Sequence, residues 1–365
     1  MNFDLTEEQH LLKDSADRFV REALCLKPID QRPHHAEIWA RMAELGWLGL
    51  PLPERVGGLD GSFEDVLVLM AALGRGVVST AYVSNIVLSG HLLAGCPESA
   101  LAEELLAGLV TGETRVAFAD TDSVESGVRA KRMPDAGYVL DGGKVLSHDA
   151  PHASAMLVTA DLAGEADRAL FLVRLDAEGV SLDGYPVIDG GVAGDLNLRS
   201  AHVPATALLA HGAAATALVS GAKDRAVLAN LAQIVGAAEA CLDVCSDYLK
   251  VREQFGRPLG KFQALQHKIS AMYVEAQEAR SILYYGASRI EGPAEARAQA
   301  VGEAHLVIAE AGKLISEDGI QLHGGYGVTD EFAISHYYRR IMTLTRMFQG
   351  RDGRAVGGRS APVPA

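Results

Sequence analysis

The order of hydrophobic periods along the chain is the feature that most limits its fold. Residues 1–112 carry apolar residues at helical spacing, as at Leu12 and Phe19, which lie two turns apart. Residues 113–212 instead hold short strand-like runs separated by Asp, Gly and Pro, and residues 213–350 return to long alanine-rich helical stretches. The sequence therefore predicts an α+β protein with an N-terminal helical domain, a middle β-barrel or sandwich, and a C-terminal four-helix bundle.

The same patterns predict individual elements. Thr6 and Gln9 have the spacing of a capping box, so a helix should begin beside them. The glycine- and proline-rich residues 46–61 predict an ordered turn, and residues 351–365, which lack periodicity, predict a disordered tail. Further helices are expected at 36–45, 62–74, 215–252, 262–290 and 294–318, and strands at 115–119, 137–140, 155–160 and 169–174.

The charge balance excludes several classes of partner. The formal net charge is −14, and an acidic surface repels nucleic acids and anionic membranes. We find no uninterrupted apolar run of about eighteen residues, the length that would span a bilayer. The acidic N-terminal segment also lacks the basic-then-apolar pattern of a signal peptide. We therefore expect a cytoplasmic protein with no nucleic-acid or membrane partner.

Two of the four cysteines, Cys241 and Cys245, are four residues apart on an expected helix. That spacing can bind a metal, but no histidine or further cysteine near them in the sequence completes a site. The sequence therefore predicts buried structural cysteines and no metal site.

Four glycine-containing motifs occur in sequence. They are ELGWLGL at 44–50, GYVLDGGK at 137–144, REQFGRPLG at 252–260 and QLHGGYG at 321–327. In this order and at this spacing they resemble motifs of the acyl-CoA dehydrogenase family, and the resemblance covers nearly the whole chain. It implies FAD as cofactor, an acyl-CoA substrate, an oligomer, and an electron-transfer flavoprotein as electron acceptor.

The last two motifs supply the FAD-binding candidates. Arg252 can hold a pyrophosphate oxygen by charge-assisted hydrogen bonds, and Phe255 can lie against a flat apolar ring. Gln321 can hydrogen-bond a phosphate or the adenosine. The full set is Arg252, Gln254, Phe255, Gln321, Gly324 and Gly325, which in the family reach the FAD of a neighbouring subunit.

Each of these features also has a purely structural interpretation. Arg252 could simply complement the dipole of a helix C-terminus, and Gly324 with Gly325 could form an ordinary helix cap. His267 and His323 are catalytic residue types, but no acid or nucleophile accompanies them in the sequence. We expect both histidines to be packing or capping residues.

The catalytic base of the family is missing from its usual position. Its reaction removes an α-proton from the thioester, and many members use a glutamate in a C-terminal Tyr-Glu-Gly-Thr segment. The matching residue here is Gln349, whose amide can hydrogen-bond but cannot take a proton from carbon. Some members place the base on the first long bundle helix, which corresponds to Ala226 here. Asp224 is close in sequence and is a weak alternative base, since two residues along a helix turn the side chain by roughly 200°.

The segments that line the flavin ring in the family are also altered. They correspond to residues 119–123 and 145–149, and neither contains the family's tryptophan. Thr121, Ser123, Ser147 and His148 in these segments can still form hydrogen bonds, and ordinary surface loops are the alternative interpretation of both segments.

The motifs that in the family contact a neighbour's FAD are thus present, whereas the catalytic base and the segments that line the chain's own flavin ring are altered. This difference leads to four hypotheses. The first is a subunit of an α2β2 heterotetramer in which a partner supplies the glutamate and the flavin pocket. The family uses such complexes for bulky acyl groups such as steroid side chains. The alternatives are a self-sufficient homo-oligomer that uses Asp224, a flavin monooxygenase on the same fold, and a scaffold without catalytic activity.

Overall fold

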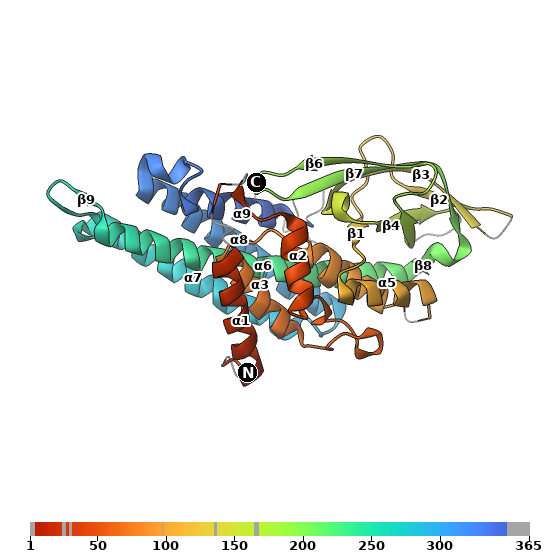
Figure 1. The fold of residues 1–365 in the computed structure, drawn as a ribbon, viewed down its shortest axis with the longest axis horizontal. Coiled ribbons are helices and arrows are strands. Elements are labelled where there is room, and N and C mark those ends of the chain that lie inside the picture. Colours follow the sequence, from red (N-terminus) through yellow and green to blue (C-terminus); the bar gives the residue numbers. More distant parts are fainter. Residues whose placement is uncertain are drawn as a thin grey trace, which may run out of the picture.

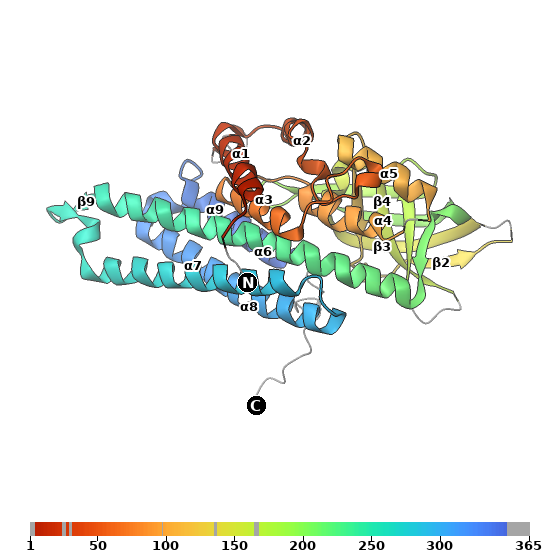
Figure 2. The same cartoon turned by 90° about the horizontal axis from the view of Figure 1, so that it is seen from below.

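The computed structural model describes residues 4–23, 27–28, 31–96, 98–134, 137–163 and 168–348. Three regions follow one another along the chain, and Figure 1 shows the β domain at one end of an elongated helical bundle. The N-terminal helices lie along one side of the long helix α6, with α7 and α8 on the other side (Figure 2). The predicted order of helical, β and helical regions is confirmed.

The N-terminal region begins with the predicted capping box. The Gln9 backbone N–H donates to Thr6 Oγ1 at 3.2 Å, and the Thr6 N–H donates to Gln9 Oε1 at 3.1 Å. A second capping box, between Ser62 and Asp65, begins α3. The elements are α1 (Glu7–Ala23), α2 (His35–Glu44), the 3-10 turns η2 (Trp47–Gly49) and η3 (Glu54–Val56), α3 (Phe63–Arg75), the π-helix η4 (Tyr82–Gly90), α4 (His91–Ala94) and α5 (Ala100–Thr111).

The middle region is a sheet in the order β6-β7-β3-β2-β4-β5-β8, with β1 paired in parallel to β4. Its core is separate from the helical core and is formed by alternating inward residues such as Leu140, Met156 and Phe171. The strands are β1 (Val116–Ala119), β2 (Arg129–Arg132), β3 (Gly137–His148), β4 (Ala155–Leu162), β5 (Arg168–Arg174), β6 (Val180–Pro186), β7 (Val192–Pro204) and β8 (Leu208–His211).

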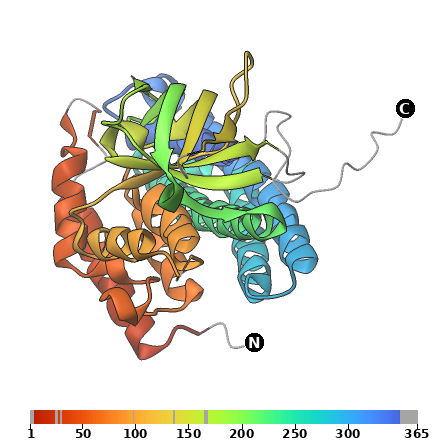
Figure 3. The same cartoon turned by 90° about the vertical axis from the view of Figure 1, so that its right-hand side faces the viewer.

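The C-terminal region is the predicted bundle of four long helices, seen nearly end-on in Figure 3. Between the first two helices is a two-stranded hairpin, β9 (Glu253–Gln254) with β10 (Arg257–Pro258), followed by the 3-10 turn η7 (Leu259–Lys261). The helices are α6 (Gly212–Val251), α7 (Gln263–Arg289), α8 (Ala294–His323) and α9 (Ala333–Arg346), and the 3-10 turn η8 (Gly324–Val328) follows α8.

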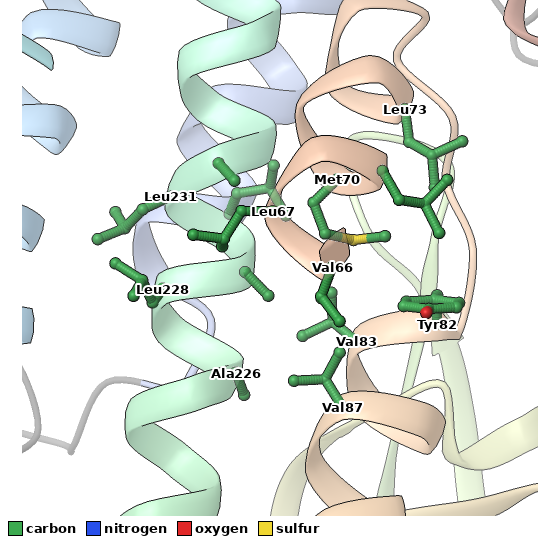
Figure 4. Packing of buried hydrophobic residues seen from close by; sticks show 14 of the residues in the cluster. Val66, Leu67, Met70, Leu73, Tyr82, Val83, Val87, Ala226, Leu228 and Leu231 are labelled. Atoms are coloured by element: carbon green, nitrogen blue, oxygen red, sulfur yellow. The ribbon is translucent and has the colours of Figure 1, made fainter. Parts of the chain in front are cut away.

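Helix α6 is the core element of the whole molecule. It is long and apolar enough to cross a membrane by length and composition, but 83% of its most apolar window is buried inside the fold. Leu67 of α3 and Leu228 and Leu231 of α6 belong to one cluster of buried residues, and Ala226 lies beside Val87 of η4 (Figure 4). The N-terminal helices and the bundle therefore share one core along α6.

Two glycines let α3 and α6 approach to backbone contact. A Cβ at Gly74 would lie 2.1 Å from the carbonyl oxygen of Gln233, and a Cβ at Gly236 would lie 2.0 Å from that of Ala71. Each helix thus presents a glycine to the other helix's backbone. Because backbone cannot yield as a flexible side chain can, this crossing accepts no larger residue.

Several elements differ from the sequence expectation. Helix α8 continues to His323, five residues beyond the expected end at 318, because its small residues hold a helical pattern up to Gly324. Helix α5 and the π-helix η4 had no predicted counterpart, and all nine residues of η4 are buried, including the polar Ser84, Asn85 and Ser89. Residues 351–365, where a disordered tail was expected, lie outside the described residues.

We expect Gly74→Ala to lower the free energy of unfolding by about 1–3 kcal/mol, because the added methyl group forces α3 away from α6. Chemical denaturation of the chain measures this. Gly302→Ala is the matched control, since Gly302 lies inside α8 with no atom within 4 Å of an added Cβ. It should stabilise the chain by about 0.5–1 kcal/mol. Similar effects of the two substitutions would contradict this account of the helix crossing.

Candidate active site

The cleft between the β domain and the bundle contains two small cavities, of about 20 and about 40 Å³. His148, at the end of β3, lines both of them. Burial lowers the pKa of His148, so its ring is neutral at pH 7. The smaller cavity is lined mainly by η4, α6 and α9, and the larger by β1, β3 and the end of α9.

A buried guanidinium organises the smaller cavity. Arg340 on α9 donates from Nη1 to Asp189 Oδ2 at 2.6 Å and from Nη2 to Gln233 Oε1 at 2.8 Å. Asp189 is itself held by the Gly191 backbone N–H at 3.1 Å. Among the described residues, the polar atoms buried here without a hydrogen-bond partner are Asn230 Nδ2, Arg340 Nε and Thr343 Oγ1.

The walls of these cavities contain strained and irregular backbone. Leu146 and Phe348 have φ values of 57° and 63°, which are uncommon for bulky side chains. The adjoining η4 is a π-helix, a form often found at functional sites. Its Ser84 hydroxyl donates to Asp149 Oδ2 at 2.5 Å. This part of the fold therefore has the features of an active-site cleft.

The two positions considered for the base lie differently with respect to this cleft. Ala226 is seven residues before Gln233, so it points within about 20° of the cavity-lining side. Asp224 is nine residues before Gln233 and points about 180° away. Its Oδ2 accepts from Arg297 Nε on α8 at 2.8 Å; the Asp224 side chain is fully buried, the Arg297 side chain is 12% exposed, and burial raises the pKa of Asp224. The structure thus separates Asp224 from the cleft, and Gln349 lies outside the described residues.

A network of charged side chains ties the β domain to α6 at the other side of the cleft. Lys223 on α6 binds Asp120 at 2.5 Å, and the fully buried Lys144 binds Asp122 at 2.6 Å. Arg168 on β5 joins both carboxylates. Thr121, between the two aspartates, lines the larger cavity, while Ser147 has a buried hydroxyl oxygen without a described partner.

The end of α9 covers the larger cavity. The Phe348 ring meets the His148 ring edge to face, with centroids 5.7 Å apart. Binding pockets for small molecules and cofactors have volumes of about 300–1,000 Å³, whereas 40 Å³ holds only a few water molecules. The cleft in this conformation does not fit a flavin ring together with an acyl group.

The FAD-binding candidates of the third motif lie at the far end of the bundle. The tip of the β9–β10 hairpin is a two-residue turn in which Phe255 and Gly256 both have positive φ, 54° and 75°. This strained backbone leaves Phe255 89% exposed. Arg252 is exposed beside it, and Gln254 is an exposed strand residue of the same hairpin. An aromatic ring held in this way is available to a flat ligand.

The candidates of the fourth motif lie at the same end. Tyr248, one turn before Arg252, stacks on His323 with ring centroids 4.2 Å apart. Gly324 follows with φ 58° and ψ −134°, a conformation almost restricted to glycine, and neither Gly324 nor Gly325 has an atom within 4 Å of an added Cβ. Gln321 is exposed on the last turn of α8. The structure therefore brings both predicted FAD-binding motifs together.

The two remaining sequence candidates differ in their surroundings. His267 is exposed on α7, whereas His323 is buried at the end of α8. His323 also approaches Cys245, with 4.0 Å between Nδ1 and Sγ. No group of three potential metal ligands occurs in the described part of the chain.

The bundle end and the cleft are far apart. Lys223, which meets the β domain, lies about 28 residues before Val251 on α6, so about 42 Å of helix separates them. Figure 1 shows the β9 hairpin at the end of the bundle remote from the β domain. The exposed side chains at the bundle end therefore cannot reach the cleft of their own chain.

A cavity larger than these two lies elsewhere. It measures about 1,000 Å³ and lies between α1, α3, α6 and α7. Its floor is apolar, and ion pairs neutralise the main charges on its rim, including Arg75 with Asp243 and Arg280 with Glu239. It thus offers little to attract the phosphates of coenzyme A.

Several residues of the cleft gave no signal in the sequence. Arg340, Asp189 and Gln233 come from three distant segments and have no common motif. The one available indication of this network was Arg340 itself, a charged residue inside the apolar stripe of α9, because a buried arginine needs a partner.

Comparison with known proteins identifies the family. The model of the acyl-CoA dehydrogenase N-terminal domain matches residues 6–113, and that of the C-terminal domain matches residues 205–354. The chain is 30% identical to isovaleryl-CoA dehydrogenase of Solanum tuberosum over 359 residues, which cover 92% of this chain and 85% of that protein. The chain belongs to the acyl-CoA dehydrogenase family, whose members are flavoproteins that act on acyl-CoA.

Two further similarities involve Mycobacterium tuberculosis. Acyl-CoA dehydrogenase FadE27 is 28% identical over the full length of both chains. The solved ChsE4–ChsE5 complex contains a chain that superposes with a TM-score of 0.85 at 27% identity, covering 97% of this chain and 96% of that chain.

The charge network predicts an acid-sensitive domain junction. Burial alone would raise the pKa of Asp120, but Lys223, Thr159 and Lys144 lower it to about 2. The resulting stabilisation is present above the unfolded pKa, near 4, and is lost as the pH falls towards 2. Asp120→Asn should lower the free energy of unfolding at pH 7 by about 2 kcal/mol and flatten its decline between pH 4 and pH 2. Denaturation measured across this pH range tests both effects, and a wild-type slope in the variant would contradict them.

Proposed function

We propose that this chain is a partner-dependent subunit of an FAD-binding acyl-CoA dehydrogenase. In an α2β2 complex, its bundle end would contact the FAD held in the cleft of a second family member, and that member would supply the catalytic glutamate. The observation that carries this proposal is the separation of about 42 Å between the FAD-contacting motifs and the chain's own cleft.

The chain's own cleft supports the same proposal. Gln349 stands where the family carries glutamate, and an amide cannot act as a general base. Ala226 occupies the alternative base position and also has no carboxylate. The cavities of about 20 and 40 Å³, together with the Asp120–Lys223 pair, leave this cleft closed. The similarity to a chain of the ChsE4–ChsE5 complex agrees with a role beside a different family member.

The roles of this chain's residues follow from their chemistry. Arg252 would neutralise and orient the pyrophosphate, with a backbone N–H of Gly324 or Gly325 close by. Gln254 and Gln321 would hydrogen-bond the phosphate or the adenosine, and Phe255 would exclude water from one face of a ring. Bound FAD supplies hydride acceptance from the β-carbon of the acyl-CoA. We further propose a bulky fatty or steroid acyl group, an electron-transfer flavoprotein as acceptor, and a cytoplasmic location.

The first experiment compares this chain alone with the chain co-produced with an acyl-CoA dehydrogenase family member from the same genome that carries the catalytic glutamate. We expect FAD content and acyl-CoA oxidation only in the complex. Full activity of the lone chain would refute partner dependence, whereas absence of FAD from every assembly would indicate a scaffold. Oxygen-dependent product formed with added reduced flavin would indicate a monooxygenase.

Arg252→Ala should weaken FAD binding to the complex about 10- to 100-fold, because charge-assisted hydrogen bonds contribute about 1.5–3 kcal/mol. Flavin fluorescence titration measures the dissociation constant. Arg174→Ala is the matched control, because Arg174 is an exposed arginine of the β domain paired with Asp176. Equal losses in the two variants would remove Arg252 from the proposed site.

Asp224→Asn tests the self-sufficient alternative. We expect unchanged turnover in the complex, since Asp224 points away from the cleft and is bound to Arg297. Asp224→Ala should lower the free energy of unfolding by about 3 kcal/mol, because it leaves a buried guanidinium unpaired. Loss of turnover in Asp224→Asn with unchanged thermal stability would instead make Asp224 the base.

A further inference from the structure

The last turns of α6 and α8 are joined by one aromatic contact. Tyr248 and His323 stack with ring centroids 4.2 Å apart and an angle of 24° between the ring planes. Tyr248 lies one turn before Arg252, and His323 directly precedes Gly324. The pair therefore lies between the two segments that the proposed function brings to the partner's FAD.

The His323 ring is fixed on both sides of this stack. Its Nδ1 lies 2.9 Å from the carbonyl oxygen of Gly319, which can only accept, so Nδ1 carries the proton. Phe332 meets the ring at an angle of 61°, with centroids 6.1 Å apart. The ring is 97% buried, since 3% of its residue surface is exposed. It consequently transmits the position of α8 directly to Tyr248 and α6.

Backbone hydrogen bonds attach the β9–β10 hairpin to Tyr248. The Arg252 backbone N–H donates to the Tyr248 carbonyl at 2.9 Å, and the Leu259 N–H donates to the Arg252 carbonyl at 2.8 Å. A displacement of Tyr248 would therefore move both the base of the hairpin and Arg252. A ligand site of this kind requires its groups to be held within about 0.5 Å of the positions that bind the ligand.

We propose that the Tyr248–His323 pair is a positioning device that sets Arg252 against Gln321 and the Gly324–Gly325 turn. It rests on the proposed function for the identity of the ligand. Neither ring needs to touch FAD: each acts by keeping two groups from different helices at the separation that one cofactor requires. The aromatic shape of His323, rather than its proton chemistry, performs this role.

The test compares His323→Ala, which removes the ring, with His323→Phe, which keeps it. FAD titration of the complex, followed by flavin fluorescence, should show about tenfold weaker binding for His323→Ala. His323→Phe should remain within about threefold of wild type. Tyr138→Ala is the control, because it removes an aromatic pair of similar geometry, Tyr138 with Phe171, in the β domain. It should leave the FAD dissociation constant unchanged.

A second readout requires no FAD. Hydrogen exchange of the Leu259 amide in the full chain should accelerate in His323→Ala and not in His323→Phe. Wild-type FAD affinity in His323→Ala, or an equal loss in His323→Phe, would overturn the positioning role. If wild type binds no FAD in any assembly, the proposed function fails, and unchanged Leu259 exchange in His323→Ala would then also refute the positioning device.

Discussion

The length of one helix determines how this chain can function. An α-helix of 40 residues is a rod of about 60 Å, and the central part of α6, residues 221–241, is buried on nearly every side. The β domain is fixed to one end of the rod and the Arg252 hairpin to the other. The cleft beside the β domain and the Arg252 hairpin of one chain therefore cannot contact the same ligand, and under the proposed function a second chain brings the two kinds of site together.

The β domain is fixed to one end of α6 by ion pairs, so the chain's own cleft can close without loss of the fold. The ion pairs of Asp120 with Lys223 and of Arg340 with Asp189 join the β domain to the bundle where a catalytic member of the family would hold its flavin. These pairs bury charge, which is favourable only when every partner is present. A chain released from catalysis in its own cleft can keep such contacts as structural links between domains.

The sequence predicted the architecture well, because the architecture depends on local pattern, whereas the assignment of Arg252, Gln321 and their neighbours to FAD stays a prediction. Helical periodicity identified the long helices, the capping box at Thr6 was confirmed, and Gly324 with Gly325 marked a turn. The buried network of Arg340, Asp189 and Gln233 could not be predicted, because its members are more than 40 residues apart and each looks ordinary in its own segment. The contact of His323 with Cys245 was missed for the same reason.

By itself, the sequence determined the identity of position 349, the order of the three regions and the residues of the FAD motifs, since these are properties of covalent structure and local period. Only the tertiary structure decided that Asp224 turns away to Arg297, that the cleft is closed, and that the segments of Arg252 and Gln321 lie at the same end of the bundle. Those outcomes depend on which helix faces pack together, and packing is set by contacts between segments distant in the chain.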